Sequence, residues 1–318
     1  RKLIVSLMVF AGISQILLSF STTLSTLYLF TLCATFGAIS AQVLIPFASS
    51  ISPPESSAAI VGKLMSGLVM GIILSRTFAG FVSNYWSWEG VYLSSGVITL
   101  LFATLMWRKL PNTQPQSDLN IVSIYQSLFQ IARNNPHLIR RACAGALGFG
   151  ILSMVFTSMT FVLGSAPYFF NDFEIGLFGL LGVIGIYSSS WSGKTVGLGK
   201  ENLVAKLCIS LMLFSCVPLF FAQQNIWIYA IGVLMSYFGL TAFHVLNQNL
   251  VYRIDAKARS RINAVYMTIY FSGAALGSLG AVYAWEHWQW QGCVALGLIF
   301  AIGILWIDRL DFKLMRKN

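Results

Sequence analysis

The chain has 318 residues, of which 57% are hydrophobic and only 9% are charged, and its mean hydropathy is +0.74. Because a soluble domain carries about 25% charged residues, this composition excludes a soluble enzyme, a disordered regulator and a disulfide-stapled secreted domain. The formal net charge of +10 does not indicate a nucleic-acid-binding protein, because the basic residues lie between apolar runs and form no single basic face.

Ten apolar runs are long enough, at about 20 residues, to cross a bilayer as helices. They are about twice the length that a strand of a membrane barrel needs, so we expect an all-α, polytopic membrane protein. The predicted spans are residues 3–20, 26–50, 59–84, 90–107, 139–164, 174–192, 204–222, 226–247, 264–285 and 292–308.

The basic residues predict the orientation of these spans. Of the 20 Lys and Arg residues, 19 lie before the first span, in every second loop, at the span ends next to those loops, or in the C-terminal tail, and the alternate loops hold none. Basic loops remain on the cytoplasmic side, so the C-terminus is predicted to be cytoplasmic. The residues assigned to this side are Arg1, Lys2, Lys63, Arg108, Lys109, Arg133, Arg140, Arg141, Lys194, Lys200, Lys206, Arg253, Lys257, Arg259, Arg261, Arg309, Lys313, Arg316 and Lys317.

The two ends of the chain overlay without a gap at a shift of 202 residues, with 12 identities over the 55 positions from 36 to 90. The pair of W-x-W-x-G sequences at 86–90 and 288–292 is the most distinctive match. Six spans separate the aligned segments, so the copies run in the same direction, as in two six-helix halves related by an axis along the membrane normal.

The repeat also predicts the domains. They are an N-terminal half at 1–107 with four of its six helices, a cytoplasmic central loop at 108–138, and a C-terminal six-helix half at 139–318. The spans at 139–164 and 174–192 have no counterpart in the first half, so we expect two helices to be missing before residue 1. Within the central loop, 118–132 is predicted to form an amphipathic helix on the inner leaflet.

An arrangement of six plus six helices with a basic central loop resembles the major facilitator superfamily, and within it the bacterial drug:proton antiporters. Arg1 and Lys2 stand where that family's Gly-…-Asp-Arg-…-Gly-Arg-Arg/Lys motif ends, and 193–200 keeps the glycines and lysines of the second copy without its aspartate. The family's antiporter motif ends in Gly-Pro-…-Gly-Gly, and the span 59–84 has neither that Pro nor the paired Gly. The resemblance implies a monomeric exporter in a bacterial inner membrane.

Arg76 is the one basic residue that lies away from the ends of a predicted span. A charge there costs at least about 2.5–3.5 kcal/mol on insertion scales, so Arg76 should face a cavity or an acidic partner. Its counterpart in the repeat is Ser278, so the twofold architecture does not require an arginine. Arg76 is therefore a candidate for binding a polar or anionic substrate group or for controlling a coupling carboxylate; a structural ion pair is the alternative.

All ten Asp and Glu residues lie in loops or at the ends of spans, although proton coupling usually needs a titratable group inside the membrane. His244 is the one histidine in a span, and an imidazole titrates near physiological pH, so it is a candidate proton shuttle; an interhelical hydrogen bond is the alternative. Buried amides need partners or a wet cavity. The amides predicted to line a substrate pathway with His244 and Arg76 are Gln15, Gln42, Asn247 and Gln248.

Small residues on several spans predict close helix packing and smooth faces for movement between the halves. The glycines in question are Gly67, Gly71, Gly80, Gly176, Gly179, Gly182, Gly185, Gly273 and Gly277. The five cysteines lie in apolar stretches without a C-x-x-C motif or a neighbouring histidine cluster, so no metal and no cofactor are predicted.

These features predict a secondary transporter that works by alternating access, with its binding site between the halves. Its partners are predicted to be a small-molecule substrate, protons and the lipid bilayer, and the resemblance favours export of drug-like or metabolite molecules. An importer or facilitator of a small solute is the first alternative. A membrane-embedded enzyme is the second, although such an enzyme normally has several acids or histidines converging in the membrane. A receptor or assembly factor is a third.

Overall fold

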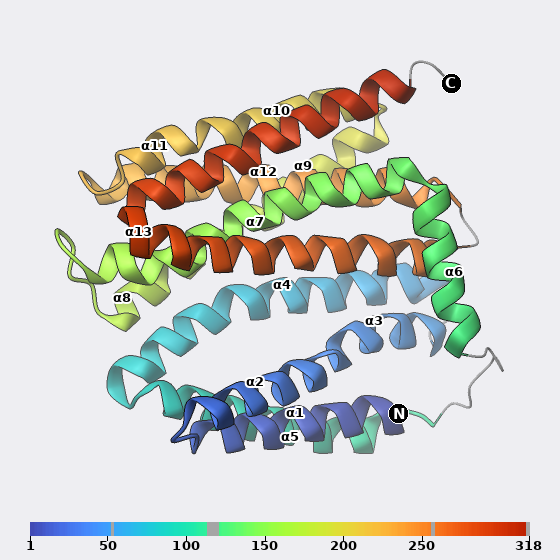
Figure 1. Ribbon diagram of the computed structural model, residues 1–318. Helices are drawn as coiled ribbons and strands as arrows, with labels where there is room; N and C mark the ends of the chain where they lie inside the picture. Colours follow the sequence, from blue (N-terminus) through green and yellow to red (C-terminus); the bar gives the residue numbers. More distant parts are fainter. Residues whose placement is uncertain (52–53, 113–120, 256–257, 316–318) are drawn as a thin grey trace. The chain divides into compact units, whose positions relative to one another are not determined.

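A computed structural model describes residues 1–51, 54–112, 121–255 and 258–315, apart from the side chains at 45–46, 49–50, 54–63, 65–66, 68–69, 73, 121–124 and 312–315. Every regular element in the described residues is a helix, which confirms the all-α class (Figure 1). Predicted cytoplasmic basic groups that lie outside the described side chains are Lys63, Lys257, Lys313, Arg316 and Lys317.

Within the described ranges, eight helical segments have the length and apolar composition needed to cross a membrane. The last of them belongs to α13 (Arg259–Met315), in which Gln289 has non-helical backbone angles, so this element contains two helices, as the predicted spans 264–285 and 292–308 require. The predicted span 59–84 corresponds to the 32-residue helix α4 (Pro54–Tyr85). The protein is therefore a multi-pass membrane protein.

The chain forms two compact units, the first of which contains residues 1–118 and 171–180. In this unit α1 packs against α2 and α5, and α4 packs against α8. Two of these helices, α2 and α5, begin at side-chain caps: Thr23 accepts a hydrogen bond from the Thr26 amide, and Ser87 accepts one from the Gly90 amide. The helices of the first unit, besides α4, are α1 (Lys2–Ser19), α2 (Leu24–Ala38), α3 (Ser40–Ile51), α5 (Trp88–Lys109) and α8 (Asp172–Leu177).

The second unit contains residues 119–170 and 181–318, and its core lies where α7, α12 and α13 meet. Ile151, Phe243 and Tyr266 are each at most 1% exposed in this core. The 3-10 helix η1 (Phe178–Val183) joins the two units along the chain. The helices of the second unit, besides α13, are α6 (Ile121–Asn134), α7 (Pro136–Gly164), α9 (Ile184–Gly197), α10 (Glu201–Phe214), α11 (Cys216–Phe220) and α12 (Ile226–Tyr252).

The central loop contains the predicted helix, which runs as α6 over Ile121–Asn134; residues 118–120 of the expected helix lie outside the described ranges. Tyr125 and Phe129, one turn apart on α6, are 69% and 68% exposed. Their placement in the inner leaflet stays a prediction, as do the domain boundaries at 107 and 139 and the missing helices.

The packing of α7 against α13 depends on two glycines. A Cβ atom on Gly273 would lie 2.6 Å from the Ala146 Cα, and one on Gly277 would lie 2.6 Å from the Gly150 Cα. Such distances are shorter than any real contact of a Cβ atom, so the backbones of the two helices approach each other directly. Small residues permit this approach in membranes, where packing and not hydrophobic burial holds helices together.

A leucine at Gly273 is therefore expected to force α7 and α13 apart and to destabilise the second unit by about 1–3 kcal/mol. Thermal unfolding in detergent measures this loss. Gly197→Leu at the end of α9 is the matched control, because no described atom lies within 4 Å of a Cβ atom placed there. Equal melting temperatures for the two variants would contradict the packing argument.

Candidate functional site

The second unit has a polar cluster within its helical core. The Nδ1 atom of His244 on α12 lies 3.2 Å from the hydroxyl oxygen of Tyr266 on α13, a hydrogen bond whose direction depends on the histidine tautomer. The His244 ring also lies 4.4 Å, between centroids, from the ring of Tyr270, and Tyr270 stacks on Phe149 of α7 at 4.6 Å. The imidazole of His244 thus packs against Tyr266 and Tyr270 of α13, and Phe149 of α7 in turn packs against Tyr270.

Close packing of α7 brings Tyr266 to this position. A Cβ atom on Gly145 would lie 2.7 Å from the Tyr266 hydroxyl, so only a glycine leaves space for the phenol. Tyr266 is fully buried, whereas Tyr270 is 7% exposed and His244 is half-buried. The sequence predicted His244 as a candidate but did not predict its two tyrosine partners, which come from a different helix.

Asn247 lies three residues after His244, on the same face of α12. It is fully buried, and neither its amide oxygen nor its amide nitrogen has a hydrogen-bond partner among the described residues. A buried unsatisfied polar atom costs about 1–3 kcal/mol, so native structures rarely keep one without a water or ligand. The Tyr266 hydroxyl on α13 is a polar neighbour of this amide, and the Asn247 side chain retains hydrogen-bonding capacity for a polar molecule.

The other predicted amides lie in different surroundings. Gln248 follows Asn247 on α12 and is half-buried. In the first unit, Gln15 on α1 is half-buried, and its side-chain oxygen has no partner among the described residues. Gln42 on α3 is exposed. Their role in a substrate pathway stays a prediction.

Arg76 lies on α4 in the first unit and is half-buried. A Cβ atom on Gly179 would lie 2.6 Å from the Arg76 Cβ and 3.1 Å from its Cδ, and one on Gly176 would lie 2.9 Å from the Arg76 carbonyl oxygen. The hydroxyl of the next residue, Thr77, donates to the Gly176 carbonyl at 3.2 Å. The aliphatic part of Arg76 is therefore packed against a backbone of small residues.

The contact of α4 with α8 continues one turn further. Gly80 faces the Asp172 carbonyl so closely that a Cβ atom would overlap it, and the Ser83 hydroxyl donates to the Asp172 carboxylate at 2.5 Å. No described atom, by contrast, lies within 4 Å of a Cβ atom placed on Gly67 or Gly71. Whether any of these glycines takes part in gating stays a prediction.

The remaining glycines of the predicted series lie in the second unit. Cβ atoms on Gly182 and Gly185 would lie 2.9–3.3 Å from the Tyr237 ring and hydroxyl on α12. In the same unit Ser278, the repeat counterpart of Arg76, shares a hydrogen bond of 2.9 Å with Thr157 on α7. At the positions that the predicted repeat aligns, the first unit thus has a guanidinium and the second unit has a hydroxyl.

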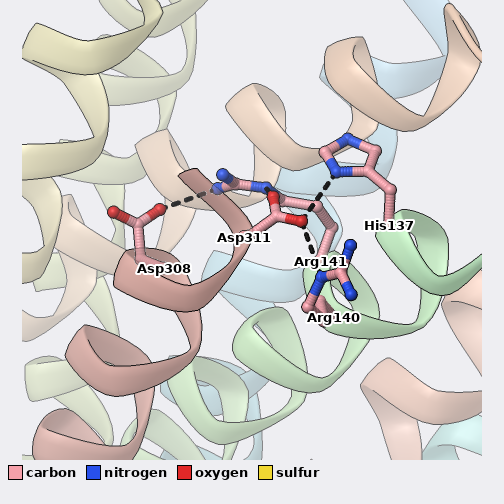
Figure 2. Close-up of polar contacts among 5 residues, drawn as sticks. All are labelled: His137, Arg140, Arg141, Asp308 and Asp311. Atoms are coloured by element: carbon pink, nitrogen blue, oxygen red, sulfur yellow. Dashed lines mark hydrogen bonds and ion pairs between the residues drawn. The ribbon is translucent and has the colours of Figure 1, made fainter. Parts of the chain in front are cut away.

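A second polar cluster joins the beginning of α7 to the end of α13, as Figure 2 shows. The Asp311 carboxylate accepts hydrogen bonds from Nε of Arg140 at 2.8 Å and from Nε of Arg141 at 2.7 Å, and it lies 2.9 Å from Nδ1 of His137. Arg141 also donates to Asp308 at 2.9 Å. Asp311 and Arg141 have side chains that are only 1% and 5% exposed.

Helical spacing brings these five residues together. His137, Arg140 and Arg141 are three and four residues apart, and so lie on one face of α7, which begins with Pro136 in its first turn. Asp308 and Asp311 are likewise three residues apart on α13. From the sequence, these groups were expected at helix ends, and the cluster was not predicted. One pattern could have indicated the cluster: basic residues stand at the beginning of one span, and two acidic residues three positions apart stand at the end of another.

No group of three or more His, Cys, Asp or Glu residues that could hold a metal ion was found in the described part of the chain. The five cysteines are free thiols, three of them buried, at positions 33, 143, 208, 216 and 293.

Comparisons with known proteins agree on one family. The model of the Major Facilitator Superfamily matches residues 1–278. The uncharacterized transporter YgaY of Escherichia coli O157:H7 is 34% identical over 306 residues, which cover 96% of this chain and 78% of that protein. The inner membrane transport protein YnfM of Escherichia coli strain K12 is 22% identical over 279 residues, covering 86% of this chain and 66% of that protein.

Two solved structures share the fold. A bacterial homologue of the human lysosomal transporter Spinster, in an inward-facing and occupied conformation, superposes with a TM-score of 0.73 at 12% identity. The match covers 99% of this chain and 82% of that one. The nucleoside transporter NupG, as its D323A mutant, gives a TM-score of 0.73 at 12% identity, covering 96% and 82%.

Proposed function

The chain belongs to the major facilitator superfamily, and on that premise we propose that it is a proton-coupled exporter of small drug-like or metabolite molecules. Membership of this transporter family supports a secondary transporter of small solutes. Alternating access between two halves at about 1–107 and 139–318, with a site near the midplane, is the mechanism that this architecture suggests.

The observation that carries the proposal is the Asn247 amide, which is fully buried and has no hydrogen-bond partner among the described residues. It lies beside the hydrogen-bonded pair of His244 and Tyr266. A transporter needs polar groups that form their hydrogen bonds with the solute and not with the protein. A group that already has a hydrogen-bond partner inside the protein adds no binding free energy for the solute. Arg76 is the corresponding candidate in the first unit.

Proton coupling is assigned to His244. Imidazole is the side chain that changes charge between about pH 5 and 8, and intramembrane histidines occur in the proton relays of transporters. Its hydrogen bond to Tyr266 gives the ring a fixed orientation and a neutral partner. The proposal places the protein as a monomer in the bacterial inner membrane with its C-terminus in the cytoplasm. The relative YnfM, an inner membrane transport protein, supports the choice of membrane.

The proposal is tested by proton movement in inverted vesicles that contain the protein. A panel of cationic, anionic and sugar-like compounds is added after a pH gradient has been formed, and a pH-sensitive dye follows its collapse. At least one class is expected to dissipate the gradient with the unaltered protein. His244→Gln is expected to abolish this signal, because an amide cannot carry the proton at the ring position.

Tyr266→Phe is the matched control, since it removes only the hydroxyl partner of His244 and is expected to retain the proton signal. A full proton signal in His244→Gln would contradict the assignment of the coupling residue. No signal from any compound, with folded protein in the vesicles, would contradict proton coupling itself.

A facilitator or importer is the second candidate, and the continuity of α4 favours it. This helix runs unbroken over Pro54–Tyr85, and its sequence lacks the Gly-Pro and paired Gly of the antiporter motif. Counterflow of labelled solute without a proton gradient separates the two functions. Counterflow together with an absent proton response identifies a facilitator, whereas a solute-dependent proton response identifies the exchanger.

A further inference from the structure

The second unit contains a cavity of about 960 Å³, and no residue of the two polar clusters described above lines it. It lies between the two helices of α13, next to the turn at Gln289, and Gln223 from the connection between α11 and α12 closes one side. This is the end of α13's two helices opposite to Asp311, and so the predicted outer side of the membrane (Figure 1). A cavity of this size holds a molecule of several tens of atoms.

The lining of the cavity is polar but uncharged at the turn. It is formed there by three amides, Gln223, Gln289 and Gln291, together with the indole of Trp288 and the phenol of Tyr283. No Lys, Arg, Asp or Glu is among the described lining residues. Amide, indole and phenol groups donate hydrogen bonds to ester and phosphate oxygens without selecting for a net charge.

Further from the turn the lining becomes apolar. Small side chains, Gly280, Ala284 and Ala295, leave a groove between the two helices, and Leu296 and Ile299 form its wall. Ile299 is 64% exposed, so the groove is continuous with the surface of the protein that faces the acyl chains. The cavity thus has the polarity profile of a single leaflet: hydrogen-bonding groups at the surface and hydrocarbon beneath.

The turn that holds the polar end is fixed in an unusual backbone conformation. Gln289 has φ of 54° and ψ of −151°, a region that only glycine occupies readily. The next residue, Trp290, is 1% exposed, and its indole nitrogen donates to the Leu219 carbonyl at 2.6 Å. Burial of Trp290 therefore imposes the conformation that keeps Gln289 on the cavity lining. Backbone strain of this kind persists where the surrounding structure over-determines it, often beside a ligand.

We propose that this cavity binds one zwitterionic glycerophospholipid from the leaflet at this end of the helices. The lipid's glycerol esters and phosphate lie against the three amides, and an acyl chain lies in the groove beside Ala295. Charge decides against an anionic lipid: the loops predicted on this side hold no Lys or Arg, and the exposed charged residue of the turn is Glu286. An acidic neighbour attracts the ammonium group of a zwitterionic headgroup and repels a net negative charge.

Native mass spectrometry of the detergent-purified protein tests the proposal, with phosphatidylethanolamine or phosphatidylglycerol added back after delipidation. The protein is expected to bind one phosphatidylethanolamine in preference to phosphatidylglycerol. Ala295→Trp fills the groove at an exposed position and is expected to weaken that binding about tenfold or more. Leu298→Trp is the matched control, because Leu298 is 40% exposed on the same helix but does not line the cavity.

Equal phosphatidylethanolamine binding by Ala295→Trp and Leu298→Trp would overturn the proposal, as would preference for phosphatidylglycerol or binding of detergent alone. If Ala295→Trp does not fold, Gln291→Leu serves instead, because it removes one exposed amide from the polar end without filling the groove. Weaker phosphatidylethanolamine binding by that variant supports the site, and unchanged binding overturns it.

Discussion

Replacing Asp311 by asparagine is expected to destabilise the second unit by about 3 kcal/mol. The carboxylate is 1% exposed and accepts from Arg140 and from the 5%-exposed Arg141. Asparagine has nearly the same size but no charge, so Asp308 is the one ion-pair partner that Arg141 keeps among its two described ones. A buried guanidinium with half of its counter-charge removed costs far more than the lost hydrogen bond alone, because water cannot replace the missing oxygen.

Thermal and denaturant unfolding in detergent measure this loss, and Glu201→Gln supplies the control. Glu201 also pairs with an arginine, Arg253, at 2.8 Å, but the Arg253 side chain is 57% exposed. Solvent screening limits such a surface pair to less than about 1 kcal/mol. Equal destabilisation by the two variants would show that burial of the Asp311 cluster does not matter.

Arg76→Ala is expected to reduce substrate transport to background while the protein inserts and folds normally. The guanidinium is the one basic group away from the ends of the predicted spans, and its insertion cost of at least about 2.5–3.5 kcal/mol is retained although the repeat has Ser278 at the equivalent position. The variant loses the packing of the Arg76 aliphatic part against Gly179 but keeps the hydrogen bond from Thr77 to the Gly176 carbonyl, so α4 and α8 are expected to remain packed. Uptake of labelled substrate into inverted vesicles measures the effect.

Arg108→Ala is the matched control, because Arg108 is exposed in the last turn of α5 and is expected to leave the transport rate unchanged. Arg76→Lys separates charge from shape: partial activity indicates that a positive charge suffices, and no activity indicates that the planar guanidinium is required. Normal transport by Arg76→Ala would contradict the assignment of Arg76 to the substrate pathway.

The local properties of the chain predicted the helices well. The prediction of a helix at 226–247 corresponds to α12 at Ile226–Tyr252, and the amphipathic helix of the central loop corresponds to α6. Apolar length and periodicity are properties of a contiguous segment, so no knowledge of neighbouring helices is needed to read them. The ends of the helices were predicted less accurately: the last span was predicted to stop at 308, whereas α13 continues to Met315.

That extension explains why the Asp311 cluster was missed. Beyond residue 308 the chain was expected to leave the membrane, so an aspartate there had no reason to be buried. Local electrostatics also argues against the observed arrangement: arginines near the beginning of α7 and aspartates near the end of α13 both oppose the helix dipoles. Only the antiparallel approach of the two helices, across 170 residues of sequence, makes the charges favourable.

The sequence by itself therefore determined that this protein crosses the membrane many times as helices, and it singled out Arg76 and His244 as chemically costly residues in apolar runs. Only the tertiary structure decided that His244 meets Tyr266, that Asn247 is left unpartnered within the described residues, and that a lipid-sized cavity opens beside Gln289. The physical reason is that hydropathy acts along a segment, whereas hydrogen bonds and cavities depend on how neighbouring helices rotate and pack.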